Sequence, residues 1–203
     1  SDTKAGLKIC DEIYNKICKK VYKAKNIKTA EMAKIFENIQ RDVNIALTNQ
    51  GSVIANKLGI SFTDVLETCS TKWNSLNFYP GLVGGHCVSI DPYYLIDDCK
   101  KKNIDSSIIT LCRSYNERFV NLVYNKIVKL IKKIKKPKIL LVGLSFKDGV
   151  VDFRNSKYIK LYKMLKKLFF VRVLESEQPL KKSGIKNVKL DNNKKNLGNY
   201  NFI

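Results

Sequence analysis

The sequence predicts an α/β fold, in which a mainly helical domain is followed by a unit with parallel strands. Residues 29–58 and 105–132 have the apolar spacing of amphipathic helices. Farther along, KILLVGLSF at 138–146 and VRVLES at 171–176 are short, continuous apolar runs. Such runs are typical of buried parallel strands, and the helical period between them completes one strand–helix–strand unit.

Changes in composition divide the chain into three parts. Residues 1–25 are expected to be a linker or the remnant of a preceding domain, and residues 26–132 form the helical domain. The basic linker KKIKKPK at 132–138 marks a boundary, so residues 133–203 are expected to begin an α/β domain. Within that part, the polar and lysine-rich residues 177–203 predict no particular structure.

Apolar spacing and capping residues predict the first helices. Isoleucine or valine recurs at every fourth position in residues 4–25, which favours an amphipathic helix. Thr29 is a good N-cap for the long helix, whereas Gly51 is expected to interrupt that helix and to kink it. A further helix should start near Ser61 or Thr63. One side of the long helix is expected to carry Ile35, Ile39, Val43, Ala46, Leu47, Val53 and Ile54.

Two more helices are expected before the strands, and one between them. Pro92 suits the first turn of a helix in PYYLIDDCKK. Residues 105–132 form a longer helix, and residues 155–169 form the helix between the two strands. The apolar positions of the longer helix are expected to be core: Ile108, Leu111, Phe119, Leu122, Val123, Ile127, Leu130 and Ile131.

The stretch FYPGLVGGHCVSIDPYYL, at 78–95, places Cys87 in a turn rich in glycine and proline. His86 precedes this cysteine, and Asp91 follows it four residues later. Glycine allows a ligand to approach the backbone closely, and a thiol becomes a nucleophile when its thiolate is stabilised nearby. The alternative is a buried cysteine in a structural loop, which composition alone favours.

PGLVGGHCVSIDPYYL closely resembles the active-site loop of the nucleotide-sugar 6-dehydrogenases, the UDP-glucose/GDP-mannose dehydrogenase family. Two other stretches agree in order and spacing. Residues 30–50 resemble the central helix of the family, and residues 143–157 resemble the opening of its last domain. The resemblance covers about residues 1–176. It implies a helical central domain that forms dimers through the long helix, followed by an incomplete, Rossmann-like domain that binds the UDP-sugar.

The resemblance also assigns catalytic roles. It implies that Cys87 attacks the C6 aldehyde of a nucleotide sugar, while Lys34 and Asn38 stabilise the oxyanion and Asp91 assists water or tunes Lys34. Lys34, Asn38 and Arg41 share one face of a helix, and without the resemblance this face would be an ordinary solvated one. Cys87 would then form a thiohemiacetal and a thioester during two successive oxidations by NAD, with no metal.

Ligand-binding roles follow from the same resemblance. Lys147 would meet the UDP-sugar, together with Gly84, Gly85 and His86. Arg154 would order its loop and contact the cofactor, NAD. The sequence has no GxGxxG fingerprint, and the NAD-binding domain of the family has no counterpart in it. We therefore expect a chain truncated at both ends that is inactive alone.

The loop resembles the branch of the family that acts on UDP-N-acetylhexosamines for surface polysaccharides such as bacterial capsules. His86 and Ile90 stand where the UDP-glucose branch has serine and lysine. Three alternatives stay open: a UDP-glucose or GDP-mannose 6-dehydrogenase, a non-catalytic remnant that dimerises, and a basic nucleic-acid-binding protein.

The formal net charge of +20 is typical of proteins that bind phosphates. Its excess is almost entirely lysine, which favours a composition bias of the source genome over a nucleic-acid partner. The six cysteines form no CxxC pair, and His86 is the only histidine, so we expect no metal and reduced thiols in the cytoplasm. No apolar run reaches the roughly 18 residues of a membrane span.

Overall fold

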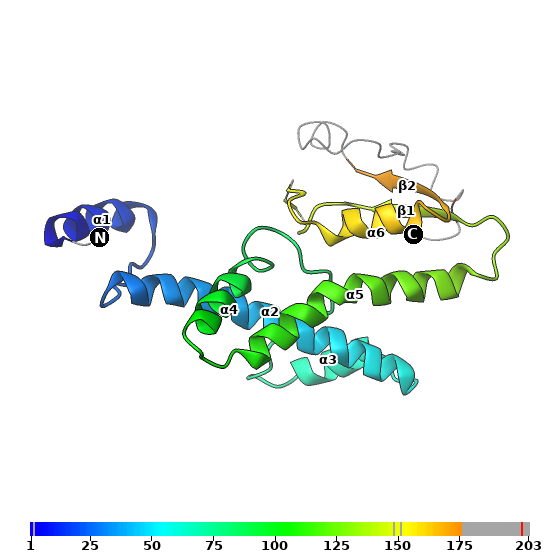
Figure 1. Cartoon of the computed structure of the whole chain (residues 1–203), viewed down its shortest axis with the longest axis horizontal. Coiled ribbons are helices and arrows are strands. Elements are labelled where there is room, and N and C mark those ends of the chain that lie inside the picture. The colour runs from blue at the N-terminus through cyan, green and yellow to red at the C-terminus, as the bar shows by residue number, and fades with distance from the viewer. Residues whose placement is uncertain (2, 148, 151, 176–199, 201–203) are drawn as a thin grey trace.

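The computed structural model describes residues 1, 3–147, 149–150, 152–175 and 200. In this part, helices precede a pair of parallel strands, which confirms the predicted fold class (Figure 1). The division into three parts stays a prediction, and most of residues 177–203 lie outside the described residues. The elements are α1 (Lys4–Ile17), α2 (Ile27–Lys57), α3 (Phe62–Ser70), α4 (Asp91–Lys101), α5 (Ser107–Ile131), β1 (Lys138–Val142), α6 (Lys157–Leu165) and β2 (Phe170–Leu174).

The long helix α2 begins earlier than predicted and is not interrupted. Asn26, not Thr29, is its N-cap, because the Asn26 Oδ1 atom accepts the Thr29 N–H at 2.8 Å. Gly51 lies inside continuous helix. A Cβ atom at Gly51 would lie 2.8 Å from the Phe62 ring of α3, so glycine at this position allows α3 to pack closely.

The apolar residues of α2 lie on two faces rather than one. Ile39 and Ala46 are buried, whereas Leu47 and Ile54 are exposed. The buried face also carries polar residues, among them Asn38 and Asp42, so burial does not follow apolarity along this helix. The exposed face carries a line of separate apolar residues, which we call the α2 stripe: Met32, Phe36, Leu47, Ile54 and Leu58.

The shorter helices agree with the sequence in position and differ in burial. Ser61 caps α3, and Pro92 lies in the first turn of α4. In α3, Phe62 and Leu66 are half-buried, whereas Val65 is exposed. The predicted amphipathic helix within residues 4–25 is α1, which has no buried residue and lies apart from the other elements (Figure 1).

Helix α5 connects the helical domain to the α/β unit. It contacts α2 and α4 and also α6, so each part of the helix buries only the side that faces a neighbour. Phe119 and Ile131 are buried as predicted. The expectation that the other apolar positions are core is wrong for those on the outer side, which are exposed: Ile108, Leu111, Leu122 and Leu130.

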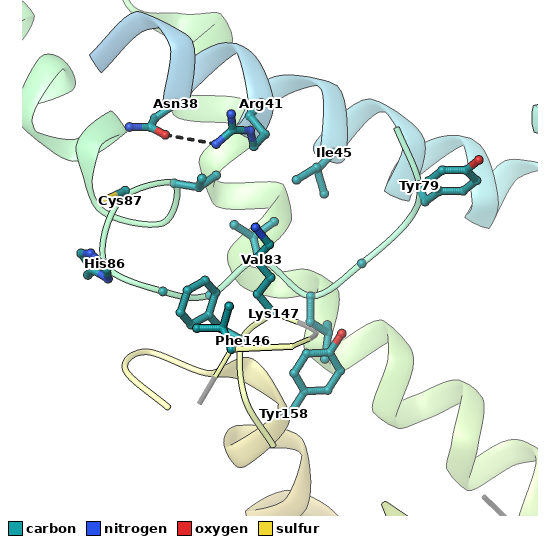
Figure 2. A pocket seen from close by; sticks show the side chains of 16 residues that line it. Asn38, Arg41, Ile45, Tyr79, Val83, His86, Cys87, Phe146, Lys147 and Tyr158 are labelled. Carbon is teal, nitrogen blue, oxygen red and sulfur yellow. Dashed lines mark hydrogen bonds between the residues drawn. The ribbon is translucent and has the colours of Figure 1, made fainter. Parts of the chain in front are cut away.

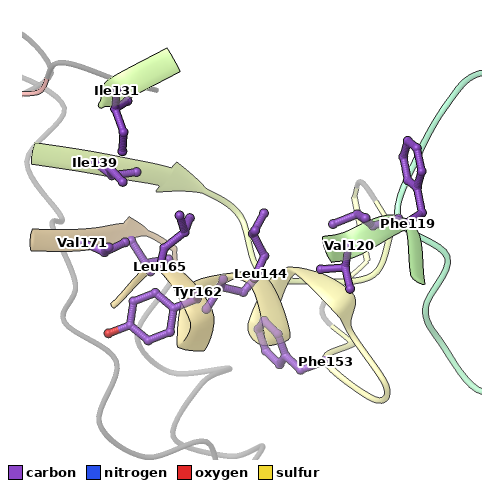
Figure 3. Packing of buried hydrophobic residues seen from close by; sticks show 12 residues of the cluster. Phe119, Val120, Ile131, Ile139, Leu144, Phe153, Tyr162, Leu165 and Val171 are labelled. Carbon is purple, nitrogen blue, oxygen red and sulfur yellow. The ribbon is translucent and has the colours of Figure 1, made fainter. Parts of the chain in front are cut away.

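The α/β unit consists of one strand–helix–strand element with a buried apolar core. Strands β1 and β2 are parallel, with Lys138 opposite Phe170. β1 ends at Val142, earlier than predicted, because Gly143 has a φ of +82° and turns the chain away. Side chains of β1, α6 and β2 pack with residues of α5 in one buried cluster (Figure 3). This shared core fixes the α/β unit against the end of α5.

Candidate active site

The Cys87 loop, residues 78–90, runs between α3 and α4 and is tied at both ends. The Asn49 side chain of α2 donates to the Gly81 carbonyl at 3.0 Å and accepts the Gly81 N–H at 2.8 Å. At the other end, the N–H of Asp91 donates to the Cys87 carbonyl at 2.8 Å, where α4 begins. The thiol therefore lies directly before a helix whose first carboxylate is Asp91.

The glycines of this loop lie against the α/β unit. A Cβ atom on Gly84 would be 2.9 Å from the Asn155 carbonyl oxygen, and one on Gly85 would be 2.9 Å from the Phe146 ring. Gly85 has a φ of +86°, and its N–H donates to the Arg154 carbonyl at 3.1 Å. Glycine is required at both positions because the Asn155 carbonyl group and the Phe146 side chain leave no space for a Cβ atom. The substrate-binding role of Gly84 and Gly85 stays a prediction.

Two of the four predicted catalytic side chains converge on the carboxylate of a third, Asp91. The Asn38 side chain donates to Asp91 Oδ2 at 2.7 Å, and the Lys34 ammonium group contacts the same oxygen. Asn38 and Asp91 are buried, whereas the Lys34 side chain is 57% exposed. The hydrogen bond to Asp91 raises the pKa of Lys34 above its ordinary value, and the charge of Cys87 adds to this effect. Lys34 is therefore an ammonium ion at neutral pH.

A cavity of about 840 Å³ lies over the Cys87 loop, between α2 and the turn after β1 (Figure 2). Cys87 is half-buried in its wall, and Asn38 and Lys147 also line it. The predicted residues Gly84, Gly85 and His86 line it as well, as do the unpredicted Arg41, Tyr79, Phe146 and Tyr158. The cavity thus combines a thiol, cationic groups and aromatic rings.

Arg154 lies beside the cavity rather than in its lining, and it is held by Asp152. The Arg154 Nε atom is 3.0 Å from Asp152 Oδ1, and this contact is the main reason that the pKa of Asp152 falls to about 2. His86 approaches the same carboxylate, with its Nδ1 atom 3.7 Å from Asp152 Oδ2. The Arg154 side chain is 64% exposed, so its guanidinium group remains accessible to an anion.

Sequence reasoning did not predict a second, buried polar group beneath the loop. Arg113 Nη1 is 2.7 Å from Asp42 Oδ1, and both side chains are only 1% exposed. Asn116 donates to the same Asp42 oxygen at 2.8 Å and accepts a hydrogen bond from Asn49. Burial raises the pKa of Asp42, and the charge of Arg113 opposes that shift. A signal was present in the sequence, because Asp42 and Asn49 are seven residues apart on one helix face.

The described residues contain neither a metal-ligand cluster nor a membrane-spanning helix. There, no three histidine, cysteine, aspartate or glutamate side chains gather closely enough to ligate a metal ion. Within the same ranges, no helix combines the length and apolarity needed to cross a membrane.

The family model that matches residues 28–118 is the UDP-glucose/GDP-mannose dehydrogenase family, central domain. The chain belongs to this family. The match contains α2, the Cys87 loop, α4 and the first half of α5. It therefore covers the elements that bring Lys34, Asn38 and Asp91 together with Cys87.

Two known relatives match most of this chain. The chain is 42% identical over 164 residues to a UDP-N-acetyl-D-glucosamine 6-dehydrogenase of Salmonella typhi, with 78% of this chain and 39% of that protein covered. It is 39% identical over 165 residues to protein CapL of Staphylococcus aureus, with 79% and 39% covered. The chain thus spans about two-fifths of the length of these relatives.

A solved structure of the dehydrogenase family has the same fold. The UDP-D-ManNAc dehydrogenase of Pyrococcus horikoshii superposes with a TM-score of 0.75 at 31% identity, covering 84% of this chain and 42% of that one. The agreement extends beyond the central domain, because the share covered is larger than residues 28–118.

Proposed function

We propose that this chain carries the covalent catalytic site of a UDP-N-acetylhexosamine 6-dehydrogenase, which oxidises the C6 alcohol of the sugar to a carboxylate in two NAD-dependent steps. The observation that carries the proposal is the convergence of Lys34 and Asn38 on Asp91, four residues after Cys87. The choice of substrate rests on the similarity to relatives named for UDP-GlcNAc and UDP-ManNAc.

The first role of these residues is to bind the aldehyde that the first oxidation produces. The Cys87 thiolate forms a bond to C6, and the electrons of the C=O bond move onto the oxygen. Lys34 has three N–H donors and Asn38 has two, so each can bond Asp91 and still donate to this oxyanion. Lys34 brings a full positive charge, because the contact with Asp91 keeps it protonated.

The second role is to release the product. NAD, when bound, supplies the acceptor for the hydride that leaves C6. A water molecule then attacks the resulting thioester carbon, its proton passes to Asp91, and the C–S bond breaks to restore the Cys87 thiolate. Asp91 is placed for this role because its buried carboxylate lies at the end of the Cys87 loop, four residues after the thiol.

Among the described residues, Arg154 is the one that we assign to the cofactor, NAD. Arg154 presents an exposed guanidinium group that Asp152 holds beside the Cys87 loop, which suits a contact with an anionic group of NAD. Because the sequence has no GxGxxG fingerprint, we assign no other described residue to the dinucleotide.

The cavity also suits the sugar nucleotide. Lys147 is exposed at its rim and provides a point charge for a phosphate group. Tyr158 keeps a neutral hydroxyl group, because burial raises its pKa, and this hydroxyl can donate to a sugar or phosphate oxygen. We propose that Gly84, Gly85 and His86 contact the sugar, since they line the same wall as Cys87.

Ligand protection of the thiol tests this proposal without requiring turnover. The 203-residue chain is alkylated with iodoacetamide, and the modification of each cysteine is quantified by peptide mass spectrometry. UDP-GlcNAc or UDP-ManNAc should slow the alkylation of Cys87 more than GDP-mannose does, while half-buried Cys99 on α4 serves as an internal control. Equal protection by GDP-mannose would contradict the substrate class, and protection of Cys99 alone would contradict the site.

The variant Lys147→Ala extends the same experiment. Loss of the phosphate contact should raise the UDP-sugar concentration that half-protects Cys87 and leave the rate without ligand unchanged. Lys160→Ala removes an exposed lysine of α6 that does not line the cavity, so it is the matched control.

A further inference from the structure

A row of ion pairs, buried at Asp42 and Arg113 and partly buried at Glu117 and Lys157, crosses the boundary between the helical domain and the α/β unit. Lys157 at the start of α6 is 2.5 Å from Glu117 Oε2 on α5, and Glu117 Oε1 is 3.3 Å from Arg113 Nη2. Arg113 continues the row to Asp42 on α2, at 2.7 Å. None of these four side chains lines the cavity over Cys87. The row therefore joins α6, α5 and α2 outside the site described above.

The same guanidinium group also reaches the Cys87 loop. Arg113 Nη1 donates to the carbonyl of Val88, the residue after Cys87, at 3.3 Å. Through Asn116 and Asn49, the network extends to Gly81 at the start of the loop. One buried polar network thus holds the loop on both sides of the thiol.

Stability alone is a poor reason for this arrangement. Burying ions costs free energy, and apolar residues of similar volume often stabilise a protein core at least as well. Here Arg113 is 1% exposed, and its Nε atom is buried with no hydrogen-bond partner among the described residues. What the guanidinium provides is geometry, because its planar fork can reach acceptors on α2, on α5 and on the loop at the same time. A lysine has one compact charged group and cannot do so.

We propose that Arg113 is a positioning residue for the Cys87 thiol, which couples the placement of the thiol to the docking of the α/β unit through Glu117 and Lys157. When α6 is in place, Lys157 holds Glu117, Glu117 orients Arg113, and Arg113 fixes the loop at Val88. The inference concerns the position of the thiol, so it holds whatever substrate the cavity accepts.

The test compares alkylation rates of Cys87 and Cys99 in the folded 203-residue chain. A half-buried thiol reacts mainly when its surroundings open, so losing an anchor should speed its alkylation. Lys157→Met should raise the rate at Cys87 about tenfold, the equivalent of one lost charge-assisted hydrogen bond, and leave Cys99 unchanged. Lys157→Arg keeps a cation at the boundary and should restore the original rate.

The controls separate positioning from general loosening. Lys102→Met removes an exposed ion pair with Asp98 on α4 and should not change the rate at Cys87. Arg113→Lys should speed alkylation of Cys87 at least as much as Lys157→Met does. If Arg113→Lys does not fold, the proposal is tested by the alkylation rate of Cys87 in Lys157→Met and Glu117→Gln. An unchanged Cys87 rate in the folded variants, or an equal rise at Cys87 and Cys99, would overturn the proposal.

Discussion

At the residue scale, two carboxylates hold the cationic side chains of the site in place. Asp91 accepts from both Lys34 and Asn38, and Asp152 accepts from Arg154 beside His86. In each case a carboxylate holds a cation in place and leaves other N–H groups of that cation available. This is how a lysine and an arginine on the protein surface become oriented groups rather than freely rotating ones.

The Lys34–Asp91 contact predicts a pKa change that can be measured directly. Asp91→Asn should lower the pKa of Lys34 toward its ordinary value, because the carboxylate is the main cause of the upward shift. NMR titration of the lysine Nζ groups follows this change. Lys101, whose pKa is raised by Asp97, should be unaffected. An unchanged Lys34 pKa in Asp91→Asn would contradict the assigned contact.

The Arg154–Asp152 pair predicts an acid transition. The folded pKa of Asp152 lies at about 2, below its ordinary 3.8, so the pair contributes its full stabilisation above about pH 4. That contribution is lost as the pH falls through about 2. A carboxyl titration by NMR should show the low midpoint, and Arg154→Ala should return it toward 3.8. The account is wrong if the midpoint of Asp152 is ordinary when Arg154 is present.

At the element scale, α2 shows what a periodic pattern can and cannot predict. The spacing of apolar residues predicted the helix and nearly its full length. It did not predict which apolar residues are buried, because α4 and α5 cover a face that includes Asn38, Asp42 and Asn49. The polar residues on that face are satisfied by partners more than 50 residues away, and no local pattern contains this information.

Gly51 provides a stability prediction for the contact between α2 and α3. Alanine is a better helix former than glycine by about 1 kcal/mol, so Gly51→Ala would stabilise an isolated α2. In the folded chain, the new methyl group would meet the Phe62 ring at 2.8 Å. Such overpacking typically costs about 1–3 kcal/mol, so thermal unfolding should occur at lower temperature. Adding Phe62→Ala should make the alanine at position 51 neutral or favourable relative to glycine, and failure to do so would refute the close contact.

The α2 stripe predicts a homodimer. An apolar line along a 31-residue helix is left exposed in the single chain, and a second copy can cover it by pairing the same faces. Sedimentation should therefore show dimers that Phe36→Glu and Leu47→Glu together convert to folded monomers. Leu130→Glu, on the outer side of α5, is the control and should remain dimeric. Monomers of the unaltered chain at high concentration would count against this pairing.

At the scale of the whole molecule, the site lies where the two parts of the chain meet. The sequence predicted Cys87, Lys34, Asn38 and Asp91 because they occur in motifs whose order and spacing could be compared with a family. Arg113 could not be predicted in this way. Its importance arises only when α2, α5 and the Cys87 loop are packed together, since its partners come from all three.

The most direct test of the central claim is to observe the bond between Cys87 and a sugar aldehyde. The C6 aldehyde of UDP-GlcNAc, labelled with ¹³C at C6, is added to the 203-residue chain and followed by ¹³C NMR. We expect a new resonance of a carbon bonded to both sulfur and oxygen in the unaltered chain, and none with Cys87→Ala. If Cys87→Ala produced the same resonance, or if the aldehyde bound the unaltered chain without producing it, Cys87 would not be the nucleophile.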